Sequence, residues 1–239
     1  MDSKAFFIGI KKTFPLIVGV IPFGLAYGIM GSQAGLTVAE TAFMSMTVFA
    51  GAAQFMAVEM IRQHTGLAFI VLSTVLINLR HILMGLSLSQ YLNKLKNGWL
   101  YLLAFGMTDE SYAVTINHYQ NSGRDEGNPW FMLGSSLGMY LSWLGSSIIG
   151  GLLGYSINDP LSWGLDFAMT ATFLSILIPQ IKSMRILMVI LVSGISAVAA
   201  YLLIPGKWYI IIATILAAAT GTIMEVIEER RSVKCGRTM

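Results

Sequence analysis

Residues 66–91 read GLAFIVLSTVLINLRHILMGLSLSQY, a long apolar stretch with one arginine, Arg80, near its centre. An α-helix needs about 20 apolar residues to cross a hydrocarbon layer of about 30 Å. A helix also satisfies its own backbone hydrogen bonds, as a segment surrounded by lipid must. The stretch therefore predicts a membrane-spanning helix that carries a cation inside the bilayer.

The composition of the whole chain also indicates a membrane protein. Of its 239 residues, 55% are hydrophobic and 11% are charged, and its mean hydropathy is +0.70. Soluble domains carry about 25% charged residues. The net charge of +3 would suit nucleic acid, but the cations stand in short runs between apolar stretches, as in membrane proteins. Because Cys235 is the one cysteine, an intrachain disulfide and a cysteine-based metal site are excluded.

Eight apolar stretches can be separated, with short connections that contain turn residues such as Asn128-Pro129. We predict an all-α polytopic transmembrane bundle of about eight segments, of which one can be re-entrant. No connection is long enough for a soluble domain, so residues 1–239 are predicted to form one domain, with 232–239 as a disordered tail. The predicted segments are 14–32, 37–61, 66–91, 98–117, 130–155, 163–181, 184–204 and 208–227.

Lysine and arginine mark the cytoplasmic side of a membrane protein. With eight crossings and a cytoplasmic N-terminus, the outer loops would hold only Lys94, Lys96 and Lys207, and the other cations outside the bilayer would be cytoplasmic. This bias predicts that both termini lie in the cytoplasm.

Charged residues at membrane depth are the most informative feature, because each costs a few kcal/mol or more unless it is paired or hydrated. Arg80 and Asp109 are almost equally far along the chain from the turn near residues 94 and 95. In an antiparallel helical hairpin equal distance means equal depth, about 20 Å from that turn. An Arg80–Asp109 pair near the midplane is therefore predicted, with neighbouring polar side chains at Asn78, His81 and Glu110.

Such a pair has two interpretations. It can be a structural salt bridge that fixes helix packing, or it can bind a zwitterion, since a guanidinium suits a carboxylate and a carboxylate suits an ammonium group. Intramembrane ionisable groups are functional by default, which favours binding. Asp109, Glu110 and His81 can also titrate and could couple transport to protons.

Two stretches are typical of interrupted helices. One contains Pro22 and Gly24 in the first segment, and the other contains Gly51 and Gln54 in the second. Transporters often break helices at the midplane so that free backbone groups hold the substrate, and Gln54 would add a side-chain amide there. The alternative is a tolerated proline kink with a seam of small residues.

Catalysis is not indicated. The sequence Gly134-Ser135-Ser136-Leu137-Gly138 fits the G-x-S-x-G pattern of hydrolases, but it lies in a continuous apolar helix instead of a strand–turn–helix elbow, and no histidine follows it. The chain contains no P-loop, no cluster of metal ligands and no dinucleotide fingerprint. No enzyme activity, metal or cofactor is expected.

Four short motifs in the first half of the chain point to a known family. They are Pro22-Phe23-Gly24, Phe49-Ala50-Gly51-Ala52-Ala53-Gln54-Phe55, Asn78-Leu79-Arg80-His81 and Thr108-Asp109-Glu110. With these motifs, and in segment spacing over nearly its whole length, the chain resembles the AzlC family of bacterial branched-chain amino acid exporters. The resemblance implies a multi-pass protein of the bacterial cytoplasmic membrane that exports neutral amino acids together with a separately encoded small membrane subunit of the AzlD type.

The leading hypothesis joins the resemblance and the charge pattern. An exporter driven by the proton motive force would bind the substrate carboxylate at Arg80 and its ammonium group at Asp109 or Glu110. The alternatives are an uncoupled channel for small solutes and a membrane scaffold subunit of a two-component complex. Oligomerisation is compatible with each of them.

Overall fold

A computed structural model describes residues 2–121, 127–156, 183–204 and 208–236, together with positions 174, 177, 178 and 181, and it describes side chains as far as residue 227. The described residues form helices and no strand, which confirms the all-α prediction. The chain groups into two compact units, 1–169 and 170–239. The single domain over residues 1–239 remains a prediction.

Five helical stretches among the described residues are long and apolar enough to cross a membrane. Three belong to the first unit: α1 (Ser3–Gln33), α8 (Pro129–Ser156), and α4 (Leu67–Asn78) with α5 (Arg80–Leu92), which form one stretch from Leu67 to Leu92. The second unit contains α10 (Met184–Leu203) and α11 (Trp208–Gly236). The helix α11 enters the predicted disordered tail and ends at Gly236.

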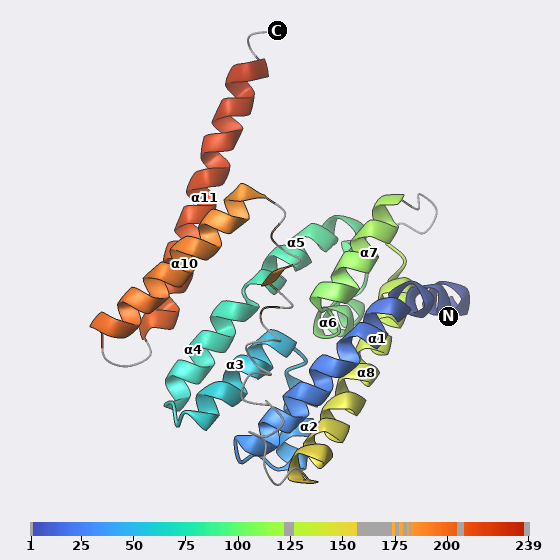
Figure 1. Cartoon of the computed structure of the whole chain (residues 1–239). Helices are drawn as coiled ribbons and strands as arrows, with labels where there is room; N and C mark the ends of the chain where they lie inside the picture. The colour runs from blue at the N-terminus through green and yellow to red at the C-terminus, as the bar shows by residue number, and fades with distance from the viewer. Residues whose placement is uncertain are drawn as a thin grey trace. The chain divides into compact units, whose positions relative to one another are not determined.

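The parallel pair of α1 and α8 forms the core of the first unit (Figure 1). Glycines bring the two backbones together: Gly9 lies against Phe131, and Gly28 lies against Ser147. The hydroxyl of Thr13 donates to Ser135 at 2.7 Å within this contact. Both helices advance in the same direction along the contact, so their N-terminal ends lie at the same end of the unit.

The predicted helix break at Pro22 and Gly24 is wrong. Helix α1 is continuous from Ser3 to Gln33 and contains both Pro15 and Pro22. Gly24 is buried against Ser146 of α8, where a side chain would overlap the serine. The alternative, a tolerated proline in a seam of small residues, therefore describes this stretch.

Helices α6 (Asn97–Phe105) and α7 (Asp109–Asn121) form the first of two folded-back pairs. Trp99 at the start of α6 packs edge-on against Trp130 at 4.9 Å, and Tyr119 near the end of α7 donates to the Asn128 carbonyl at 2.7 Å. Both ends of the pair thus lie at the start of α8. The turn between them reaches Tyr140, whose ring lies 6.0 Å from that of Phe105.

Helices α2 (Val38–Thr47) and α3 (Gly51–Arg62) form the second folded-back pair. The chain enters α2 at the far end of α8, where Tyr155 donates to the Leu36 carbonyl at 2.9 Å. The turn after α2 lies at Tyr140, whose ring is 5.0 Å from that of Phe49. A hydrogen bond of 3.1 Å from Gln54 back to Ser45 shows that α3 reverses beside α2. The two folded-back pairs therefore approach the middle of α8 from opposite ends (Figure 1).

This arrangement corrects the predicted segments 37–61 and 98–117. Each is interrupted, at 48–50 and at 106–108, and neither forms one helix long enough to cross a membrane. The prediction allowed one re-entrant segment, whereas two fold back. The predicted segment 163–181 lies almost entirely outside the described residues.

The prediction also placed Lys94 and Lys96 on the opposite side of the membrane from the N-terminus, and this is wrong. The linker 93–96 joins α5 to α6 at the end of the unit where α8 starts, because Tyr91 lies 5.5 Å from Tyr119 there. The N-terminus is at the same end, since Asn128 donates to Asp2 at 2.8 Å.

The tight α1–α8 contact gives a prediction about two glycines in one helix. The substitution Gly28→Ala places a methyl group on the backbone of α8, whereas the same change at exposed Gly19 meets nothing within 4 Å. We expect Gly28→Ala to destabilise the fold by about 1–3 kcal/mol, because overpacking forces backbone shifts. Thermal melting of the detergent-purified protein would measure this, with Gly19→Ala melting at or above wild type. Equal melting of the two variants would contradict the contact.

Candidate functional site

The predicted Arg80–Asp109 ion pair is present. Arg80 Nη1 lies 2.7 Å from Asp109 Oδ2. Arg80 is the first residue of α5, in the middle of the long stretch Leu67–Leu92, and Asp109 is the first residue of α7, at the turn of a folded-back pair. The ion pair therefore joins the centre of one long stretch to the tip of an interrupted one.

The start of α7 leaves the carboxylate of Asp109 free for this pairing. Thr108 Oγ1 accepts from the Ser111 amide at 3.2 Å, and Ser111 Oγ accepts from the Thr108 amide at 2.8 Å. This reciprocal capping satisfies the helix start, so neither acid is needed as a cap. Asp109 and Glu110 then lie in the first turn of α7, where the helix dipole favours negative charge.

Several polar groups near the pair have no protein partner among the described residues. Arg80 Nε and Asn78 Oδ1 are buried without a hydrogen bond, and Glu110 forms no ion pair or hydrogen bond. His81 is engaged, because its Nδ1 lies 3.2 Å from the Asn78 carbonyl. The side chains of Arg80 and Asp109 are 37% and 46% exposed, so the pair can be reached. Unpartnered buried polar atoms normally indicate a missing water, ion or ligand.

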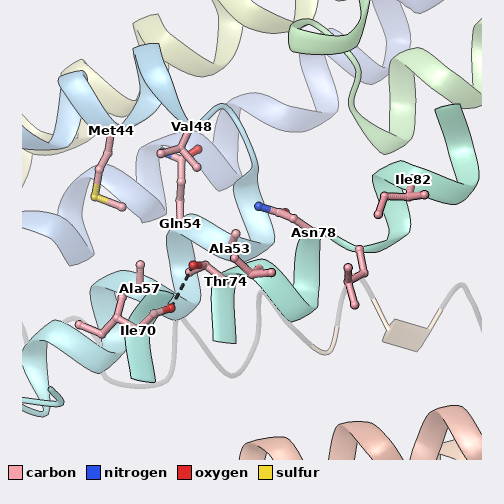
Figure 2. Close-up of a pocket in the computed structure, with 11 residues that line it drawn as sticks. Met44, Val48, Ala53, Gln54, Ala57, Ile70, Thr74, Asn78 and Ile82 are labelled. Carbon is pink, nitrogen blue, oxygen red and sulfur yellow. Dashed lines mark hydrogen bonds between the residues drawn. The ribbon is translucent and has the colours of Figure 1, made fainter. Parts of the chain in front are cut away.

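A cavity of about 390 Å³ lies between the α2–α3 pair and α4 (Figure 2). Its lining is mostly apolar, which suits an aliphatic group, and its volume is in the range of small-molecule sites. Of its polar members, Thr74 donates to Ile70 at 3.0 Å and Gln54 is already hydrogen-bonded, which leaves the amide oxygen of Asn78. The lining residues are Met44, Val48, Ala53, Gln54, Ala57, Ile70, Thr74, Val75, Asn78, Leu79 and Ile82.

The helix break predicted at Gly51 is present. Helix α3 begins at Gly51, and the preceding Phe49 has a left-handed backbone with φ of 42°. Such a conformation costs a residue with a side chain about 1–3 kcal/mol, and it persists only where the surroundings impose it. Gly51 packs against the ring of Trp143, which a β-carbon would approach to 3.2 Å.

Gln54 imposes this conformation. Its side chain is fully buried, and it accepts from the Ala50 amide at 3.2 Å and from Trp143 Nε1 at 3.1 Å while it donates to Ser45 at 3.1 Å. The amide thus ties α2, the break and α3 to α8. Gln54 lines the cavity, as predicted for a site residue, but its hydrogen-bonding capacity is largely used by the protein.

Tyr140 and Trp143, the two aromatic residues of α8 that pack against the α2–α3 break, were not predicted from the sequence. Trp143 stacks on Tyr27 at 5.7 Å and also packs on Phe55. Their signal was a tyrosine and a tryptophan in the middle of an apolar segment, away from the interfaces where such residues usually anchor. Among the described residues no group of His, Cys, Asp and Glu could hold a metal ion.

Comparisons with known proteins give one family. The family model described as AzlC protein matches residues 15–157. The branched-chain amino acid transport protein AzlC of Bacillus subtilis is 30% identical over 96% of this chain and 89% of its own. An uncharacterized membrane protein of Archaeoglobus fulgidus is 32% identical over 77% of this chain and 80% of its own. Inner membrane protein YgaZ of Escherichia coli is 28% identical over 75% of both chains. No solved structure matches.

The role of Gln54 can be tested by stability. In Gln54→Leu the Trp143 indole and the Ala50 amide lose their acceptor, and each buried unpaired donor costs about 1–3 kcal/mol. We expect a lower thermal melting point, whereas Gln120→Leu, at an exposed position of α7, should melt like wild type. If Gln54→Leu melts like Gln120→Leu, this amide does not hold the break.

Proposed function

This chain belongs to the AzlC family, and on that premise we propose that it exports branched-chain or similar neutral amino acids, driven by the proton motive force. It is a multi-pass membrane protein, and the Bacillus subtilis relative is named as a branched-chain amino acid transport protein. The observation that carries the proposal is the Arg80–Asp109 pair at mid-span, because Arg80 directly follows Leu79, which lines the apolar cavity.

The chemistry of the site suits a zwitterion with an aliphatic side chain. Asp109 engages Nη1 of Arg80, and the remaining guanidinium donors can bind a substrate carboxylate. Glu110 has no partner in the described part of the chain, so it can bind the ammonium group. Asp109 then orients Arg80, and the cavity accepts the hydrocarbon tail.

We propose that titratable side chains near the pair couple transport to protons. Glu110, Asp109 and His81 are the groups proposed to exchange protons, and the sequence carries no nucleotide-binding motif that would supply ATP energy. A small AzlD-type subunit is proposed from the family resemblance alone.

The distribution of cations supports a cytoplasmic N-terminus. Lys4, Lys11, Lys12 and the linker with Lys94 and Lys96 lie at one end of the first unit. The opposite end carries Arg62, which pairs with Glu59 at 2.8 Å. Lysine-rich ends face the cytoplasm. The two folded-back pairs are then re-entrant, α6–α7 from the cytoplasm and α2–α3 from outside. The cytoplasmic C-terminus predicted from the sequence remains part of the proposal.

The proposed function is tested by leucine counterflow in proteoliposomes that contain the full chain with its small subunit. Arg80→Ala should lower counterflow by about 30-fold or more, because removing one partner of a charged pair costs about 2–5 kcal/mol. Asp109→Asn and Glu110→Gln should also lower it. The matched control is Arg62→Ala, which removes an arginine from the exposed pair at the end of α3. Wild-type counterflow in all three site variants would reject the site. If an imposed pH gradient does not drive leucine uptake against the leucine concentration gradient, the protein is an uncoupled channel.

The proposed topology is tested by labelling single cysteines in a Cys235→Ser background. Lys4→Cys and Lys96→Cys should react with an impermeant maleimide from the cytoplasmic face, and Gln63→Cys from the outer face. Eight continuous crossings would place Lys96 outside and Gln63 inside, so that labelling pattern would contradict the two re-entrant pairs.

A further inference from the structure

A line of buried polar side chains runs along α7, starting beside the acids of the site. Ser111, Thr115 and His118 are all at most 5% exposed, and their spacing places them on one face of the helix. Ser111 directly follows Glu110. His118 lies near the other end of α7, about 14 Å from Asp109 along the axis at about 1.5 Å per residue.

Helices α1 and α8 pack against α7 and supply further polar groups. Gly106, whose carbonyl lies 3.4 Å from Ser111 Oγ, is in contact with Ser136. The ring of His118 stacks on Phe131 at 3.8 Å. Because the break before α7 contacts α8 at Ser136 and the end of α7 contacts it at Phe131, Thr115 lies between these levels.

Two hydroxyl groups on this line have no partner. Thr115 Oγ1 and Ser136 Oγ form no hydrogen bond, although their residues are 0% and 3% exposed. A buried hydroxyl without a partner costs about 1–3 kcal/mol. Buried waters normally occupy such positions and make about three hydrogen bonds each. The two hydroxyls therefore indicate bound water beside α7.

The line ends at a basic pair. Lys12 Nζ of α1 lies 3.0 Å from His118 Nδ1, and Lys12 is itself exposed. Lys12 is a charged group in contact with His118, and α8 contributes the Phe131 ring. An imidazole is a common proton shuttle, and His118 at the end of this line lies beside an exposed side chain.

We propose that this line, Ser111–Thr115–His118 with Ser136 and bound water, is the proton route between the site and the N-terminal end of the first unit. The inference rests on the proposed function and assigns the path of its coupling ion. An O–H bond of a carboxylic acid at Asp109 or Glu110 breaks, the proton binds to a water oxygen, and each relay group accepts one proton and donates another. One proton leaves at His118, and every relay group ends with the same number of protons as before. With a cytoplasmic N-terminus, the route releases protons to the cytoplasm as substrate leaves the cell.

The test removes one hydroxyl without changing side-chain shape. Thr115→Val takes a relay group out of the line. Thr41→Val is the matched control, because Thr41 is 1% exposed, also has an unpartnered hydroxyl and lies in α2, outside this line. In the proteoliposomes described above, we expect Thr115→Val to lower leucine uptake driven by a pH gradient by about tenfold or more. Leucine counterflow, which needs no net proton transfer, should stay within about twofold of wild type. Thr41→Val should retain both activities.

The outcomes separate this inference from the proposed function. If wild type catalyses leucine counterflow and Thr115→Val retains full uptake driven by the pH gradient, the route is wrong and the substrate site stands. If Thr115→Val loses counterflow as severely as driven uptake, Thr115 is not specific to protons and the route is also wrong. Absence of leucine counterflow in wild type would instead overturn the proposed function. His118→Gln gives a second measurement, in which pyranine-detected proton flux should fall while counterflow persists.

Discussion

The ion pair between Arg80 and Asp109 is the contact on which this account depends. It joins the middle of the long stretch Leu67–Leu92 to the tip of the α6–α7 pair. Separately, each charge would be costly inside a bilayer, and leaving one without its partner would cost several kcal/mol. The pair therefore holds the interrupted helix against α5. Its partial exposure and the unpartnered groups beside it distinguish it from a sealed structural salt bridge.

The two interrupted helices have the same order of elements, but different contacts stabilise their breaks. In each, a short linker (34–37 or 93–96) leads into a short helix, a break (48–50 or 106–108) and a second short helix. Gln54 and the aromatic residues of α8 fix the first break, whereas the Thr108–Ser111 cap and the Arg80 contact fix the second. Both breaks meet Tyr140. Irregular backbone at membrane depth is tolerated where protein or a polar cavity surrounds it, and α8 supplies that surrounding.

The sequence predicted the pair but not the path of the chain around it. Arg80 and Asp109 are almost equally far along the chain from the turn near 94 and 95, so they lie at similar depth. This holds whether the chain crosses the membrane after Asp109 or folds back there. Hydropathy measures apolar content, so it cannot distinguish one crossing from two half-length helices that fold back, and 37–61 and 98–117 were both misread. The reversal depends on particular hydrogen bonds of Tyr119, Tyr155 and Gln54 that join separate elements, which periodicity does not report. Pro22 and Gly24 were misread for the related reason that a glycine seam and a helix break look alike in sequence.

The central claim is that Arg80 receives the carboxylate of an amino acid. The most direct measurement is competition for labelled leucine by leucinol, which lacks the carboxylate, and by 4-methylpentanoate, which lacks the ammonium group. Wild type should bind leucine and discriminate strongly against both analogues, and Arg80→Gln should lose its preference for leucine over leucinol. If leucinol competes with wild type as well as leucine does, the guanidinium does not bind a carboxylate and the account fails.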